Sequence, residues 1–173
     1  MQFAVFSDSH DNFYNLEQAM STVAERGITE GIHLGDFCAP GFVRAMTAYE
    51  QMRWTCVWGN VDGAKTKILL ENKDNERFGI GEESFREFDT PDGKIFLTHF
   101  PLLARNAAET GKYRAAFYGD NHTKHAEVLE NKSLLANPGE LAGFKTGQPS
   151  FGIWDSATNK FEHVDLDDFR VTK

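Results

Sequence analysis

Side chains that can bind metal ions occur in five short polar clusters along the sequence. Two clusters, Asp8-Ser-His10 and Asp120-Asn-His122, place a carboxylate and an imidazole two residues apart. In extended backbone this spacing puts both side chains on one face, where they can bind the same cation. The other three clusters contribute one candidate each: Asp36, Asn60 and His99. Together the seven side chains offer the oxygen and nitrogen donors of a divalent-metal site.

Each cluster directly follows a short apolar run that predicts a β-strand. The runs are residues 3–6, 32–34, 57–58, 95–97 and 117–118. Because the carboxyl ends of strands in open α/β sheets line one ligand crevice, we expect the five clusters to converge. Taken alone, each could be a turn, since Asp8 suits an Asx turn and Asn60 a left-handed turn. Five such turns at five strand ends would be a coincidence, so one shared site is the better interpretation.

The composition is that of one globular domain, which we place over residues 1–173. The chain has 19.5 kDa, 40% hydrophobic and 25% charged residues, which excludes disordered and fibrous classes. With 18 basic and 26 acidic residues, the net charge is −8. This balance disfavours generic binding to nucleic acid or to an anionic membrane surface. An anionic substrate must therefore be attracted locally, for example by metal ions.

Cysteine usage and the N-terminal residues predict a cytoplasmic protein. Cys38 and Cys56 are the two cysteines, too few for a disulfide framework in a chain of this size. The first residues lack a basic segment before a long apolar one, and no run approaches ~18 apolar residues. We expect no membrane segment, and a homo-oligomer is left open.

The first half of the chain alternates predicted strands with predicted helices. Strands are expected over residues 2–6, 31–36 and 54–59, and helices over 13–27, 40–52 and 62–73. Asn12 and Asp62 are expected to cap the first and third of these helices. Strands that alternate with helices predict a parallel sheet with helical crossovers.

The second half is β-rich and has an antiparallel character. Hairpins are expected for 85–88 with 94–98, 126–129 with 133–136, and 151–154 with 161–164, together with a helix over 101–110 and a strand over 115–118. No linker or repeat divides the two halves. Two facing sheets with helices outside would bury the apolar side chains of both halves.

The ordered motifs resemble those of a known family. They are Phe-Ser-Asp8-Ser-His10-Asp-Asn12, Leu-Gly-Asp36, Trp-Gly-Asn60-Val-Asp62, Thr-His99, Tyr-Gly-Asp120-Asn-His122 and Asn137-Pro-Gly139. In this order they resemble the calcineurin-like metallophosphoesterases, in particular the small single-domain phosphodiesterase branch. The resemblance spans residues 3 to about 155. It implies an α/β fold with two facing mixed β-sheets flanked by helices, a four-layer α-β-β-α sandwich, and a dinuclear metal centre.

The resemblance also implies roles for individual residues. Asp8, His10 and His122 would hold one metal, Asn60, His99 and Asp120 the other, and Asp36 would bridge them. Asp36 and Asn60 would be the catalytic pair around a metal-bridging hydroxide that attacks a small phosphorylated substrate, a phosphodiester or a phosphomonoester. The cofactors would be two divalent metal ions, with Mn²⁺ as the first choice and Fe, Ni, Zn²⁺ or Mg²⁺ as alternatives. Asn137-Pro-Gly139 would shape a turn near the site.

Three departures from the family pattern leave alternatives open. Asp120 stands where an imidazole is usual, so His125, three residues after His122, is a rival ligand. Phe100 replaces a glycine and makes the rim bulky, and Val61 stands where many relatives carry a histidine that can protonate the leaving group. Some relatives use this domain as a protein-interaction subunit, so a non-catalytic or weakly active metal-binding scaffold is the alternative function. Every matching position keeps a coordinating side chain, which favours the hydrolase.

Overall fold

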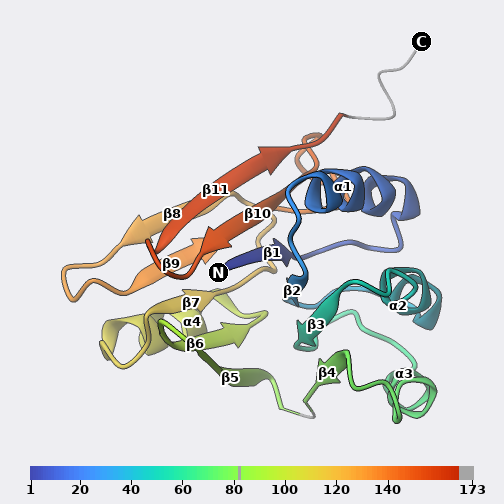
Figure 1. The fold of residues 1–173 in the computed structure, drawn as a ribbon, viewed down its shortest axis with the longest axis horizontal. Helices are drawn as coiled ribbons and strands as arrows, with labels where there is room; N and C mark the ends of the chain where they lie inside the picture. The colour runs from blue at the N-terminus through green and yellow to red at the C-terminus, as the bar shows by residue number, and fades with distance from the viewer. Residues whose placement is uncertain (82, 168–173) are drawn as a thin grey trace.

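The computed structural model describes residues 1–81 and 83–167 (Figure 1). Residues 168–173 of the predicted domain lie outside the described residues. The described chain forms two β-sheets, named here sheet A and sheet B, that face one another. No helix in this part of the chain has both the length and the apolar character needed to cross a membrane.

Sheet A has six strands in the order β11-β10-β1-β2-β3-β4. Their bounds are β1 (Gln2–Phe6), β2 (Glu30–His33), β3 (Arg53–Cys56), β4 (Phe78–Ile80), β10 (Ser150–Asp155) and β11 (Lys160–Asp165). The strands β1 to β4 are parallel, as the alternation of strands and helices predicts. The late hairpin β10–β11 joins them through an antiparallel pair with β1. Sheet A is therefore mixed.

Sheet B has five strands in the order β5-β6-β7-β9-β8. Their bounds are β5 (Phe85–Thr90), β6 (Gly93–Thr98), β7 (Ala115–Phe117), β8 (His125–Val128) and β9 (Leu134–Asn137). The predicted hairpins are confirmed as β5–β6, β8–β9 and β10–β11. The antiparallel character expected of this half is wrong for its centre, where β6, β7 and β9 are parallel. The helical crossover between β6 and β7 allows this parallel pairing.

Four helices occur in the described ranges: α1 (Phe13–Glu25), α2 (Pro40–Thr47), α3 (Lys65–Glu71) and α4 (Pro101–Glu109). Asn12 caps α1 as predicted, because its side chain accepts a hydrogen bond from Asn15 N. The prediction that α2 reaches residue 52 is wrong, since the chain turns after Thr47 and buries Met52. The predicted cap at Asp62 is also wrong. Ala64 occupies the N-cap of α3.

Three hydrophobic clusters define the layers of the fold. Side chains alternate along β1, so that Phe3 and Val5 pack against sheet B while Ala4 and Phe6 pack beneath the helices. On the far side of sheet B, Phe96 belongs to a third cluster formed with α4. The order of layers is helix, sheet, sheet, helix, which confirms the predicted sandwich of two mixed sheets.

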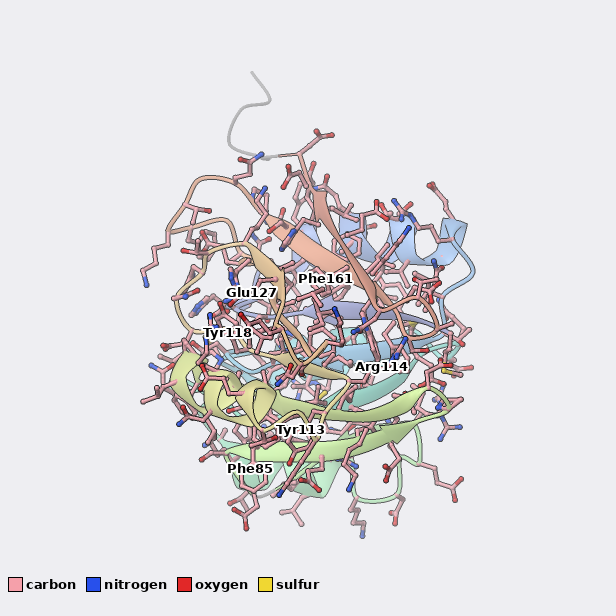
Figure 2. All side chains as sticks on the ribbon, turned by 90° about the vertical axis from the view of Figure 1, so that its left-hand side faces the viewer. Phe85, Tyr113, Arg114, Tyr118, Glu127 and Phe161 are labelled. Carbon is pink, nitrogen blue, oxygen red and sulfur yellow. The ribbon has the colours of Figure 1, made fainter. Side chains whose placement is uncertain are left out.

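Arg114 links the two sheets at the end where β1 and β7 begin (Figure 2). Its side chain lies just before β7 and donates hydrogen bonds to Ser156 O at 2.6 Å and Ala157 O at 2.8 Å, in the turn between β10 and β11. The polar clusters follow β1 and β7 and therefore lie at the opposite end of the sandwich.

The packing between the sheets predicts the cost of removing Trp154. Its ring is fully buried, with centroids 5.3 Å from Phe3 and 5.2 Å from Phe117. Trp154→Ala should lower the free energy of unfolding by about 3–5 kcal/mol, because the cavity cannot collapse between two sheets. Urea denaturation measures this loss. Leu102→Ala, at a side chain that is 73% exposed, is the control and should change it by less than about 0.5 kcal/mol. Similar losses in both variants would contradict the packing described.

Candidate metal centre

The seven predicted residues all follow strands that end at the same edge of the sandwich. Sheet A supplies four of them from the segments after β1, β2 and β3, and sheet B supplies three from the segments after β6 and β7. Ligand atoms of Asp8, His10 and His122 lie within 4.8 Å of one another, and so do those of Asp8, Asp36 and His99. The structure therefore brings together the clusters that the sequence placed at strand ends.

Asp36 belongs to the second group, and the oxygen that faces His99 also faces His10 of the first group. Its Oδ2 is 3.8 Å from His10 Nε2 and 3.4 Å from His99 Nε2. Its Oδ1 accepts a hydrogen bond from Val61 N at 3.0 Å. Burial alone would raise the pKa of this carboxyl, but hydrogen bonding and attraction from His99, with help from Val61 N, hold the pKa below its ordinary value. The carboxylate is therefore ionised and positioned to serve two ligand groups.

His99 faces oxygen atoms that cannot donate a hydrogen bond to it. Its Nδ1 lies 2.8 Å from Leu34 O, so Nδ1 donates to this carbonyl and Nε2 is the ring nitrogen that faces the site. Around Nε2 lie Asn60 Oδ1 at 3.0 Å, Asp36 Oδ2 at 3.4 Å and Asp120 Oδ1 at 3.7 Å. A second proton or a cation is needed to satisfy these acceptors. The donor set fits a metal ion bound by His99, Asn60 and Asp120.

Two buried atoms without hydrogen-bond partners in the described residues lie in the group formed by Asp8, His10 and His122. Asp8 Oδ1 and His10 Nε2 have no hydrogen-bond partner within the described ranges, although both are buried. Asp8 Oδ1 is 3.4 Å from His122 Nε2, while Asp8 Oδ2 accepts hydrogen bonds from Ser7 Oγ and Asp120 N. Burial raises the pKa of Asp8, so its charge is costly here without a counter-charge. These residues fit a divalent cation as well.

Backbone strain is concentrated at the candidate ligands. Positive φ values occur at Asp8 (52°), His10 (42°), Asp36 (60°), Asp120 (68°) and His122 (62°). Non-glycine residues in this region cost about 1–3 kcal/mol each and persist where the surroundings fix them. The loops after the strands are thus held in conformations that turn these side chains inward.

Glu140 is a residue of the site that the sequence analysis missed. It is fully buried, and His122 Nδ1 lies 2.8 Å from its Oε2. It also accepts hydrogen bonds from Lys145 N, Thr146 N and Thr146 Oγ1. Burial would raise its pKa, but the hydrogen bonds from His122, Thr146 and Lys145 lower it to about 2. The sequence offered one signal for Glu140: it stands between Gly139 and the apolar pair Leu141-Ala142. A charged residue that is buried with such neighbours needs partners.

Asp62 fixes the loops after β2 and β3 instead of capping a helix. Its carboxylate accepts hydrogen bonds from Asp36 N at 3.0 Å, Cys38 N at 3.0 Å and Gly59 N at 2.6 Å. A Cβ atom at Gly59 would overlap the Asp36 carboxylate, so this close approach requires glycine. Asp36 and the segment that carries Asn60 are therefore held together through Asp62.

Other histidines belong to separate environments. His125 Nδ1 lies 3.0 Å from the hydroxyl of Tyr118, and its Nε2 lies 3.6 Å from Glu127 Oε1. Figure 2 labels these two partners, Tyr118 and Glu127. Neither His125 nor Asp120 belongs to the two groups of ligand atoms that lie within 4.8 Å, but Asp120 Oδ1 is 3.7 Å from His99 Nε2. His33 contacts Ser9 Oγ at 3.1 Å, and burial lowers its pKa to about 3, so it is a neutral structural histidine.

Phe100 and Val61 lie at the rim of the site, and Asn137 forms the turn expected near it. Phe100 is half-buried, and the rings of Phe100 and His99 meet edge to face with centroids 5.5 Å apart. Val61 is exposed and brings no acid to the site. Asn137 accepts a hydrogen bond from Gly139 N and donates one to Gly119 O, so this turn braces the segment before Asp120.

A two-sheet sandwich with histidine and carboxylate groups at the strand ends is the architecture of metal-dependent phosphoesterases. Residues 1–159 match the family model of the calcineurin-like phosphoesterase superfamily domain. The chain belongs to the calcineurin-like phosphoesterase superfamily. This membership confirms the family expected from the motifs.

Individual relatives agree with this membership over nearly the whole chain. A phosphodiesterase of Methanocaldococcus jannaschii is 28% identical over 171 residues, which cover 96% of this chain and all of that protein. The solved structure of an archaeal phosphodiesterase superposes with a TM-score of 0.84 at 29% identity and covers 96% of this chain and 100% of its own. A phosphoesterase from E. coli shares the fold, with a TM-score of 0.67 at 21% identity over 96% of this chain and 100% of that one.

The contact between Glu140 and His122 predicts an effect on metal affinity. Glu140→Gln should weaken Mn²⁺ binding about 10–100-fold, because an amide holds the imidazole less firmly in the tautomer that presents Nε2. Isothermal titration calorimetry with Mn²⁺ measures the change. Glu130→Gln, at an exposed position, is the matched control and should bind Mn²⁺ as the unmodified protein does. Equal affinities in all three proteins would contradict this role for Glu140.

Proposed function

We propose that this protein is a metal-dependent phosphodiesterase, a hydrolase with two divalent metal ions, and that phosphomonoesters are its second class of substrate. The single observation that carries the proposal is the position of Asp36, whose Oδ2 faces a histidine of each ligand group. A carboxylate shared in this way is what a two-metal hydrolase requires. Family membership and the phosphodiesterase relatives support the reaction class.

Each side chain has a defined part in this proposal. Asp8, His10 and His122 would hold one ion, Asn60, His99 and Asp120 the other, and Asp36 would contact both. When bound, the ions would neutralise phosphoryl oxygens and lower the pKa of a water molecule. Asn60 would bind through its side-chain oxygen, which already points at His99 Nε2.

The donor set favours Mn²⁺. Four of the seven candidate side chains would bind through oxygen, and Asp120 would add a negative charge where the family pattern has an imidazole. Hard oxygen donors suit Mn²⁺ and Mg²⁺ better than Zn²⁺. The local positive charge of two such ions would also attract an anionic substrate to a protein whose net charge is −8.

Neither Val61 nor His125 offers an obvious proton for the leaving group. Val61 donates only its backbone amide, to Asp36, and His125 is engaged with Tyr118 instead. Water or another group must then protonate a departing alkoxide. Esters with good leaving groups need less of this help, because general acid catalysis contributes about 10²–10⁴-fold where it operates.

Asp36→Asn should abolish hydrolysis more completely than any other single ligand substitution. Loss of its charge disturbs both ligand groups, so kcat/KM for bis(4-nitrophenyl) phosphate should fall about 10³-fold or more, or about 4 kcal/mol. The assay is release of nitrophenolate with Mn²⁺ supplied. Asp74→Asn, at an exposed position outside the site, is the control and should keep full activity. Normal Mn²⁺-dependent turnover by the Asp36 variant would contradict the proposal.

Asp120→His should shift metal preference toward Zn²⁺. Imidazole is a softer donor without charge, so the ratio of Mn²⁺ to Zn²⁺ affinity at the weaker site should fall about tenfold. Competitive titration of both proteins measures this ratio. If His125 were the ligand instead, Asp120→His would leave the ratio unchanged and His125→Ala would remove the second metal.

A further inference from the structure

A pocket of about 220 Å³ opens beside the candidate metal centre. We call it the Lys65 pocket. Its walls come from the loop after β3, the start of α3, the segment before β5 and the residue before α4. They are formed by Trp58, Gly59, Asn60, Lys65, Glu83, Ser84 and Phe100. At ~30 Å³ per water molecule, this space matches about seven waters, enough for a short polar substituent.

The pocket and the candidate metal centre share residues. Asn60 lines the pocket, and its Oδ1 lies 3.0 Å from His99 Nε2. Phe100 lines it as well and packs edge-on against the His99 ring. A phosphoryl group bound at the centre could therefore extend one of its ester arms into the Lys65 pocket.

The walls are tied together within the protein. Thr98 Oγ1 donates a hydrogen bond to Ser84 O at 2.9 Å and accepts one from Phe100 N at 3.2 Å. On the opposite side, Gly59 N donates to the buried carboxylate of Asp62 at 2.6 Å. The bonds of Thr98 connect the pocket to sheet B, and Asp62 connects it to the loop after β2 through Asp36 N and Cys38 N. The pocket is largely preformed, which lowers the entropy cost of filling it.

Lys65 brings a positive charge to this pocket, and no carboxylate of the described residues forms an ion pair with it. Its Nζ lies 5.2 Å from the centroid of the Trp58 ring, a cation–π distance. No ion pair joins it to a carboxylate in the described ranges, and this includes Glu83, the other charged residue of the walls. The ring of Trp58 holds the side chain over the pocket, so the ammonium group is available to an incoming anion.

We propose that the Lys65 pocket is a substrate subsite that receives one ester arm and prefers an arm with a second anionic group. The inference rests on the proposed function, since that function places a phosphoryl group at the neighbouring centre. The substrates it selects are phosphoesters that carry a carboxylate or a further phosphate a few bonds from the reacting phosphorus. Lys65 is the residue that determines this preference.

The test compares two phosphonates that differ only in terminal charge. Butylphosphonate and 3-carboxypropylphosphonate are titrated calorimetrically into the Mn²⁺-loaded full-length protein. The unmodified protein should bind the carboxylate ligand about fivefold more tightly, the upper range for one solvent-accessible ion pair. In Lys65→Met the two ligands should bind equally, and Lys65→Arg should retain a preference for the anionic one. Lys67→Met, on the same helix and outside the pocket, should bind as the unmodified protein does.

The outcomes separate this subsite from the proposed reaction. A carboxylate preference that persists in Lys65→Met would overturn the subsite, and so would the absence of any preference in the unmodified protein. If the preference depends on Lys65 but no phosphoester is hydrolysed, the proposed function fails while the anion subsite stands. If neither phosphonate binds, both are overturned.

Discussion

Carboxylate and amide oxygens from the two sheets converge on a few histidine nitrogens at one edge of this sandwich. Oxygen atoms of Asp36, Asn60 and Asp120 surround Nε2 of His99, and the buried Asp8 Oδ1 has no hydrogen-bond partner in the described residues. Buried acceptors in contact are unfavourable unless a proton or a cation lies among them. The candidate site is therefore best understood as an arrangement that requires positive charge, either protons or cations, among its oxygen atoms.

The surrounding structure keeps these acceptors from moving apart. Asp62 joins the loops after β2 and β3 by three hydrogen bonds from backbone amides. Glu140 contacts Nδ1 of His122, on the side of the ring away from Asp8. Arg114 ties the sheets together at the opposite end. Strained backbone at five of the seven candidate ligands is maintained by this framework, as expected where preorganisation outweighs local stability. The same rigidity shapes the Lys65 pocket beside the site.

Much of this arrangement could be predicted from local sequence patterns, because apolar runs ending in polar residues mark both a strand and its functional end. That logic correctly located Asp8, Asp36 and His99 at one edge of the sandwich. It missed Glu140 and misplaced Asp62, since a buried carboxylate and an exposed helix cap have the same residue type and differ in tertiary contacts alone. It also expected an antiparallel second half, because a local pattern carries no information on the pairing of strands far apart in sequence.

The most direct test of the central claim is X-ray diffraction at the Mn absorption edge from crystals of the Mn²⁺-loaded protein. The account predicts two anomalous peaks about 3.5–4 Å apart with Asp36 between them. One peak should lie among Asp8, His10 and His122, and the other beside His99, Asn60 and Asp120. A single peak, or two peaks that Asp36 does not contact, would contradict a shared carboxylate at the centre of the site.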